Sequence, residues 1–222
     1  SASHSNTIAY NHIHTIGQGL LSDMGGIYTL GVQPGTVIRN NLVHGVRSAH
    51  YGGWCLYPDE GSSHLLIENN VCFDADREVF HQHYGRENLV VNNILAFGRE
   101  AALRVSRAEP HISLTLLRNI VVSDGAPMVA LGGRAPEADA TIRSDANLFF
   151  DVAGKPPRFR LAGGSLAGLA AWKALGYDRH SRSADPGFTG LKKRHFTLPS
   201  DSPAFALGFR PIDLSRVGPR PK

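Results

Sequence analysis

The sequence predicts an all-β solenoid, a coil of short strands stacked on itself, and three observations lead to this prediction. An Asn-containing segment recurs through the first two thirds of the chain. The chain has 222 residues, of which 24 are glycines. Only 19% of its residues are charged. The repeat region lacks the 3.6-residue periodicity of amphipathic helices. Self-similarity at a period of about 20 to 50 residues is the signature of stacked repeats, so one domain of coils is expected.

Each repeat carries an asparagine between two short apolar segments. Six positions mark it: Asn11, Asn41, Asn70, Asn93, Asn119 and Asn147. Successive marks are 30, 29, 23, 26 and 28 residues apart. Stacked coils place equivalent residues about 4.8 Å apart, so each Asn side chain can hydrogen-bond to those above and below it. The sequence therefore predicts about five to six coils with a structural asparagine ladder.

A second strand lies between the asparagine marks of each coil. The segments 26–30, 55–59, 79–83 and 102–106 align with one another. Alternation of side chains along a strand directs two rows outward. One row is Tyr28, Tyr57, His81 and Arg104, and the next is Leu30, Asp59, His83 and Ser106. These rows predict a continuous outer surface of aromatic, acidic and imidazole groups.

The repeat fades after residue 150. We predict β-helix coils over residues 1–150 and a C-terminal capping segment over 151–222, because an open coil end is an unpaired sheet edge. The cap is expected to contain one short helix from Leu166 to Leu175, with Ser165 as its N-cap and Gly176 as its stop. A repeat begins within the first ten residues, so self-association through an uncapped first coil is also expected.

Composition limits the partners. The net charge is +4 and the isoelectric point is near 9.3, which fits solubility or attraction to an anionic polymer. The sequence has no basic stripe interleaved with aromatic residues, so a nucleic-acid partner is not expected. It has no run of about twenty apolar residues, so a membrane span is not expected either. Cys55 and Cys72 occupy different repeat positions, which predicts two buried free thiols. Phosphate-loop and zinc-protease patterns are not found, so no cofactor is expected.

Several segments carry a resemblance to known proteins. The repeat Arg-Asn-Asn-Leu-Val at 39–43 resembles right-handed parallel β-helix repeat proteins. The segments at 23–31, 57–63 and 81–85 resemble the β-helix glycosidases of glycoside hydrolase family 141 and their relatives. These segments read Asp-Met-Gly-Gly-Ile-Tyr-Thr-Leu-Gly, Tyr-Pro-Asp-Glu-Gly-Ser-Ser and His-Gln-His-Tyr-Gly. The resemblance implies a right-handed parallel β-helix, action on a plant or microbial polysaccharide, and a secreted or periplasmic location.

Two carboxyl groups on either side of the glycosidic bond usually carry out glycoside hydrolysis. Asp59 is the first catalytic candidate, because it lies in a Gly- and Tyr-rich strand beside two histidine positions. Asp23 is the second candidate, since it matches the other acidic segment of the resembling glycosidases. For Asp23, a purely structural role in shaping the turn that follows it is an alternative that stays open. Glu60 is held in reserve, although adjacent residues of a strand point to opposite faces.

The remaining candidates are substrate-binding residues. His81 and His83 are expected to bind sugar hydroxyls, and a metal site that they share with Asp59 is a less favoured alternative. Aromatic side chains are expected either to stack on sugar rings or to serve ordinary packing. They are Tyr28, Trp54, Tyr57 and Tyr84. Arg104 is considered as a ligand of a uronate carboxylate, against a solvated surface role.

Two other functions stay open at this point. One is a polysaccharide lyase, in which a histidine or tyrosine removes the proton beside a uronate carboxylate. The other is a glycan-binding or structural β-helix without catalysis. Paired carboxyl groups would favour hydrolysis, and a shallow surface without such a pair would favour the binding module.

Overall fold

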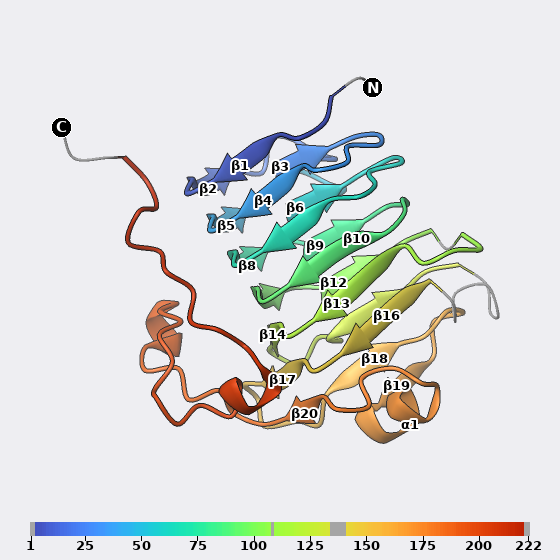
Figure 1. Cartoon of the computed structure of the whole chain (residues 1–222), viewed down its shortest axis with the longest axis vertical. Coiled ribbons are helices and arrows are strands. Elements are labelled where there is room, and N and C mark those ends of the chain that lie inside the picture. The colour runs from blue at the N-terminus through green and yellow to red at the C-terminus, as the bar shows by residue number, and fades with distance from the viewer. Residues whose placement is uncertain (1–2, 108, 134–140, 220–222) are drawn as a thin grey trace.

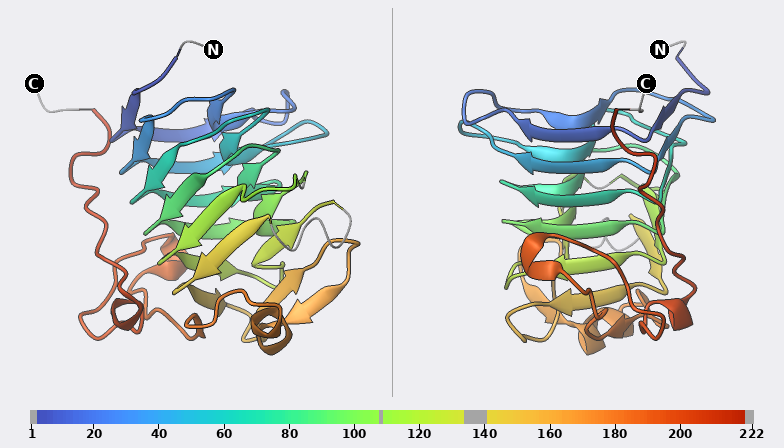
Figure 2. Two further views of the ribbon diagram at one scale, coloured as in Figure 1. Left: turned by 45° about the vertical axis from the view of Figure 1, so that its right-hand side comes forward. Right: turned by 90° about the vertical axis from the view of Figure 1, so that its left-hand side faces the viewer.

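The computed structural model describes residues 3–107, 109–133 and 141–219, which form three sheets wound around one axis (Figures 1 and 2). Sheet A consists of β1 (Thr7–Ala9), β4 (Val37–Arg39), β7 (Leu66–Glu68), β10 (Asn88–Val91), β13 (Leu114–Leu117) and β16 (Ile142–Asp145). Sheet B consists of β2 (His12–Ile16), β5 (Leu42–Val46), β8 (Val71–Ala75), β11 (Ile94–Gly98), β14 (Ile120–Ser123), β17 (Leu148–Asp151) and β20 (Arg182–Ser183). Sheet C consists of β3 (Gly25–Thr29), β6 (Trp54–Pro58), β9 (Glu78–Gln82), β12 (Ala101–Val105), β15 (Val129–Leu131), β18 (Arg158–Arg160) and β19 (Leu166–Gly168).

Each coil contributes one strand to each sheet, and neighbouring coils pair in parallel. In sheet A, for example, β1 pairs with β4, and β4 pairs with β7. The antiparallel pair is β18 with β19, at the far end of sheet C. The prediction of a parallel β-helix is confirmed, with about five turns.

The asparagine ladder is confirmed. The Asn41 Nδ2 atom donates to Asn70 Oδ1 at 2.9 Å, and Asn70 Nδ2 donates to Asn93 Oδ1 at 3.0 Å. The amide of Asn41 also donates to a backbone carbonyl, that of Ile8, at 2.9 Å. The residue before each ladder Asn has a left-handed backbone, with φ between 52° and 60°. This conformation makes the sharp corner between sheets A and B, and the ladder satisfies the polar groups that the corner buries.

The solenoid interior is apolar and continuous. Stacked residues such as Ile38, Ile67 and Val90 fill it and are at most 1% exposed. Cys55 and Cys72 are buried free thiols, as predicted, and burial raises the pKa of both.

The C-terminal helix is shorter than predicted. Helix α1 spans Leu169–Ala174 and its N-cap is Gly168, so the assignment of Ser165 as N-cap is wrong. The reason is a turn with left-handed glycines at 163 and 164, which folds β19 back onto β18 and keeps residues 166–168 extended. The helix ends as predicted, since Gly176 follows it with φ of 97°. Trp172 of α1 stacks on Phe159 with ring centroids 4.6 Å apart, which places the helix against the last coil.

Residues after β20 cover the outer face of sheet B. They include the 3-10 helices η2 (Leu191–Lys193) and η3 (Phe205–Leu207). Outward side chains of sheet B, such as Phe73, Ile94 and Val122, form a second apolar cluster with this segment. The rings of Phe73 and Phe196 lie 5.2 Å apart within it.

The last described residues run back along the coils toward the first one, as Figures 1 and 2 show. The Arg210 backbone nitrogen donates to Asn92 Oδ1 at 2.6 Å, and Asn40 Nδ2 donates to the Asp213 carbonyl at 3.2 Å. The Gly218 nitrogen donates to the Tyr10 carbonyl at 3.0 Å. The tail therefore contacts the column of left-handed corner residues, coil after coil.

Candidate functional site

The outer face of sheet C carries the predicted row of functional side chains. Tyr28 of β3 pairs in register with Tyr57 of β6, and His81 of β9 pairs with Arg104 of β12. Leu56 and Phe80 pair between β6 and β9, which puts Tyr57 next to His81. The structure thus brings all four side chains into one row that runs along the solenoid axis.

Both candidate carboxylates lie at the first two coils of this row, and a tyrosine holds each of them. The Tyr28 hydroxyl donates to Asp59 Oδ2 at 2.5 Å, and the Tyr57 hydroxyl donates to Asp23 Oδ1 at 3.3 Å. The two tyrosine rings contact each other edge to face, with centroids 5.0 Å apart. Asp59 is 7% exposed, whereas Asp23 is open to solvent. The structure therefore joins the two acids through one pair of tyrosines.

The Asp23 backbone is shaped by a turn. Its φ is 53°, in the left-handed region, and its nitrogen donates to the Tyr51 carbonyl at 2.8 Å. Gly52 beside it also has positive φ, and a Cβ there would lie 2.5 Å from the Trp54 ring and 3.0 Å from the Asp23 Cα. The loop after β5 thus fixes Asp23 in place.

Both tyrosines are hydrogen-bond donors at neutral pH. Burial raises the pKa of Tyr28, and the hydrogen bond to Asp59 raises it further. Burial also raises the pKa of Tyr57, together with the charges of Asp59 and Asp23. A phenol whose pKa is raised keeps its proton, so these hydroxyls orient carboxylates and do not act as bases.

Glu78 is a site residue that sequence reasoning missed. The residue is 1% exposed, and its Oε2 atom accepts from Trp54 Nε1 at 2.7 Å and lies 3.3 Å from His81 Nδ1. Burial acts to raise the pKa of Glu78, but the contacts with His81, Trp54 and Arg104 outweigh it and lower the pKa overall. Glu78 is therefore a buried, ionised carboxylate.

The two predicted histidines differ in surroundings. His81 is 4% exposed, and burial lowers its pKa. Its Nε2 lies 2.9 Å from the Ser106 hydroxyl, so both ring nitrogens have protein partners. His83 is half-buried, and its Nδ1 lies 3.1 Å from the same hydroxyl. Ser106 therefore links the imidazoles.

The aromatic residues divide into exposed and packed ones. Tyr28 and Tyr51 are 43% and 53% exposed. Trp54 and Tyr57 are buried against each other, with centroids 4.1 Å apart, so their rings are packed within the protein. Tyr84 meets the edge of His83, and the Arg107 guanidinium lies 4.5 Å above its ring. Tyr28 and Tyr51 are consequently the surfaces on which a flat ligand ring can stack.

Two further expectations concern Glu60 and a metal site. Glu60 is exposed, and its charge contributes to the raised pKa of Tyr28, so it lies near the pair of acids. Within the described residues, no cluster of three or more His, Cys, Asp or Glu side chains is arranged to hold a metal ion. Asp59 accepts a hydrogen bond from Tyr28, while His81 and His83 both contact the Ser106 hydroxyl.

Glu78 was not predicted because side chains do not alternate strictly between the two faces at the start of β9. It lies three residues before His81, an odd spacing that strict alternation assigns to the opposite face. Both side chains nevertheless meet on the outer face, where β9 begins at a corner of the coil. Trp54 lies at the same position of β6, three residues before Tyr57. The shared spacing from the outward row was the signal available in the sequence.

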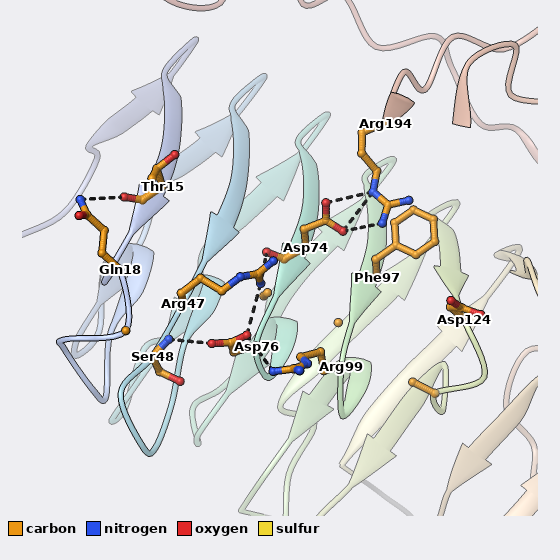
Figure 3. Close-up of a pocket in the computed structure, with 14 residues that line it drawn as sticks. Thr15, Gln18, Arg47, Ser48, Asp74, Asp76, Phe97, Arg99, Asp124 and Arg194 are labelled. Atoms are coloured by element: carbon orange, nitrogen blue, oxygen red, sulfur yellow. Dashed lines mark hydrogen bonds and ion pairs between the residues drawn. The ribbon is translucent and has the colours of Figure 1, made fainter. Parts of the chain in front are cut away.

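A separate hollow of about 850 Å³ lies where the coils turn from sheet B to sheet C (Figure 3). Its charged groups pair across coils: Asp76 lies 3.3 Å from Arg47 and 3.2 Å from Arg99. The Arg194 guanidinium binds Asp74 at 3.0 Å and lies 3.7 Å above the Phe97 ring. These pairs connect successive coils and the tail, and none of the predicted site residues lines this hollow.

Comparisons with family models, with curated proteins and with solved structures found no match to this chain. Among the described residues, none of the helices has the length and apolar character needed to cross a membrane. The class that the structure defines is therefore a parallel β-helix with an acidic and aromatic outer face on sheet C.

Proposed function

We propose that this protein is a glycoside hydrolase that acts on a plant or microbial polysaccharide through Asp59 and Asp23. One observation carries the proposal: hydroxyls of contacting tyrosines on adjacent coils hold the two carboxylates. Such a pair supplies the two groups that hydrolysis requires. One carboxyl group protonates the glycosidic oxygen, and the other attacks the anomeric carbon or activates a water. This proposal also agrees with the resemblance to the β-helix glycosidases of family 141.

The surface around the acids suits a carbohydrate. Exposed rings of Tyr28 and Tyr51 offer stacking faces, while His83 and Glu60 offer groups that bind hydroxyls. The row of functional side chains follows the solenoid axis, so a polysaccharide bound along it would cross several strands. The proposed partner is thus an extended oligosaccharide or polysaccharide, met outside the cell or in the periplasm.

The lyase alternative has less support. It needs a histidine or tyrosine that takes a proton, but Tyr28 and Tyr57 have raised pKa values and stay protonated. His81 is buried, and protein groups occupy both of its ring nitrogens. A non-catalytic glycan-binding β-helix is the second candidate function, favoured by the open, unenclosed position of Tyr28 and Tyr51.

Product analysis with a panel of plant and microbial polysaccharides tests the proposal. The wild type should release new reducing ends from at least one polymer. Asp59→Asn should lower turnover by about 10²-fold or more, because the amide can neither take nor give the proton. Glu68→Gln, a charge-removing change on sheet A, is the matched control and should retain turnover.

Each possible result has a distinct meaning. Near-normal turnover in a folded Asp59→Asn variant would end the assignment of Asp59. Binding to a polymer without release of reducing ends would favour the glycan-binding module. Self-association through the first coil remains a separate prediction, and sedimentation velocity at several concentrations measures it.

A further inference from the structure

An apolar cavity of about 820 Å³ lies between the outer face of sheet B and the C-terminal segment. Its floor is a column of residues that pair in register on four successive coils: His12, Leu42, Val71 and Ile94. Three coil steps of about 4.8 Å make this column roughly 14 Å long. The opposite wall comes from the tail between positions 193 and 214, which runs along the coils (Figures 1 and 2). The cavity is therefore a slot between two layers that follows the solenoid axis.

Both walls of the slot present apolar side chains that are not fully covered. Leu42 on the sheet is half-buried, and so are Phe196, Ile212 and Leu214 on the tail. Phe73 lies deeper and is 6% exposed. An apolar ligand would remove from water the surface that the tail leaves open. A cavity of this size that is lined mainly by apolar side chains and a few polar ones is typical of a small-molecule site.

The polar groups of the slot favour an anion. Lys193, Arg194 and His195 all line it, and Asp74 is the one carboxylate among its lining residues. The Arg194 guanidinium binds Asp74 at 3.0 Å, so this acid is already neutralised. Lys193 is exposed, and within the described part of the chain its ammonium group has no carboxylate partner. A cation beside an apolar slot suits a ligand with an apolar body and one anionic end.

The backbone around the slot indicates what kind of chain can lie in it. The strands of the floor, β2, β5, β8 and β11, already pair with one another in one parallel sheet. A peptide in the slot would bury N–H and C=O groups that find few partners there, which is costly. A hydrocarbon chain has no such groups, and its burial is favourable throughout. An acyl chain therefore fits the slot better than a peptide segment does.

We propose that this slot binds one free acyl carboxylate of medium chain length, with its hydrocarbon chain along the column from His12 to Ile94 and its carboxylate at Lys193. The site is separate from the outer face of sheet C, and it does not depend on the proposed hydrolysis. The bound chain would contact the coils and the tail together. It would therefore hold the C-terminal segment on sheet B.

Isothermal titration calorimetry with decanoate tests the site. The wild type should bind one decanoate per chain. Decanol has the same hydrocarbon length without the charge and should bind about tenfold or more weakly, because it lacks the charge-assisted contact with Lys193. Lys193→Gln should weaken decanoate binding about tenfold or more and leave decanol binding unchanged. Lys192→Gln is the matched control, since this neighbouring exposed lysine does not line the slot, and it should bind as the wild type does.

Two further measurements locate the ligand. Leu42→Trp would fill the slot and should abolish the binding of decanoate and decanol. Hydrogen exchange of residues 209–214 in the wild type should become slower when decanoate binds, because the ligand holds the tail in place.

Several results would overturn the proposal. They are a lack of one-to-one decanoate binding, decanol binding as tight as that of decanoate, unchanged binding by Lys193→Gln or Leu42→Trp, and an equal loss in Lys192→Gln. Binding to phosphatidylglycerol vesicles without binding of decanoate would assign this face to a membrane surface. Self-association that Leu42→Trp prevents, again without decanoate binding, would assign it to a second copy of the chain. Either assignment also overturns the proposal.

Discussion

Sheets B and C are built from the same coils, but the outward side chains of sheet B are covered by the chain and Tyr28 of sheet C is partly exposed. On sheet B, outward Phe73, Ile94 and Val122 are buried under the C-terminal segment. On sheet C, outward Tyr28 is 43% exposed, and its row continues through Tyr57, His81 and Arg104. The inward residues of both sheets belong to one continuous apolar core. The two faces therefore differ in their outward residues, which are covered by the chain itself on sheet B and partly exposed on sheet C.

The contrast also separates stability from function. Replacing a buried outward residue of sheet B should remove packing, whereas replacing the partly exposed Tyr28 of sheet C should change chemistry at a smaller cost in folding. The four predictions below test this separation.

The largest effect is expected from Phe73→Ala. Phe73 stacks on His44 at 4.5 Å and packs against Phe196 at 5.2 Å, so the truncation should lower the free energy of unfolding by about 3–5 kcal/mol. Tyr28→Ala is the matched change on sheet C and should cost less, about 1–2 kcal/mol, because 43% of Tyr28 is exposed. Urea denaturation measures both. Equal losses would show that the two faces do not differ in this way.

The next effect concerns turnover on sheet C. Tyr28→Phe removes the hydroxyl that binds the buried Asp59, so turnover should fall about tenfold while the free energy of unfolding changes by about 1 kcal/mol or less. Tyr10→Phe, at a corner of the first coil, is the control and should retain turnover. The assay follows reducing ends on the polymer cleaved by the wild type. A Tyr28→Phe enzyme with normal turnover would remove Tyr28 from the site.

A smaller effect is expected from pH on sheet B. Burial lowers the pKa of His12 and His44, and the neighbouring His14 lowers both further, while Asp74 opposes the shift at His44. The unfolded chain therefore binds protons first as the pH falls below about 6.5. Stability should be full above that pH and should decline toward pH 5. Urea midpoints of the wild type and of His12→Asn, which should show a shallower decline, test this. An identical slope in both proteins would contradict the assignment.

The smallest effect is expected from Arg216→Ala. The Arg216 guanidinium lies 4.4 Å above the Tyr10 ring, and such a contact at the surface contributes about 0.5–1 kcal/mol. Hydrogen exchange of residues 212–218 should become faster, while exchange in β8 and β11 stays unchanged. Faster exchange throughout the coils would mean that the tail supports the whole solenoid, and not only the cover of sheet B.

The repeat made the coils and their register predictable from the sequence. The features that were missed depend on contacts and local geometry that the repeat does not show. Asn41 and Asn70 could be placed because a ladder needs the same residue at each corner. The register of Tyr57 with His81 followed from the same alignment. Glu78 was missed because β9 begins at a corner, where strict alternation fails.

Two other differences arise from long-range packing. Trp54 could not be recognised as a packed residue, because the neighbours that bury it belong to other segments of its own and the next coil. The cover of sheet B was not predicted, since residues 184–219 carry no repeat whose register points to a partner. In both cases the information lies in contacts between segments and not in a local pattern.

The tail along the corners has a consequence for the order of folding. Most coil contacts join residues one turn apart, such as the 23 positions between Asn70 and Asn93, so coils can form by adding one neighbour at a time. The bonds from Arg210 to Asn92 and from Asn40 to Asp213 span 118 and 173 positions. Such distant closures are slow and gain nothing until the coils exist. We therefore expect the tail to dock last during folding and to detach first on partial unfolding. Its detachment would expose the apolar outer face of sheet B, which would then be the first surface to promote aggregation.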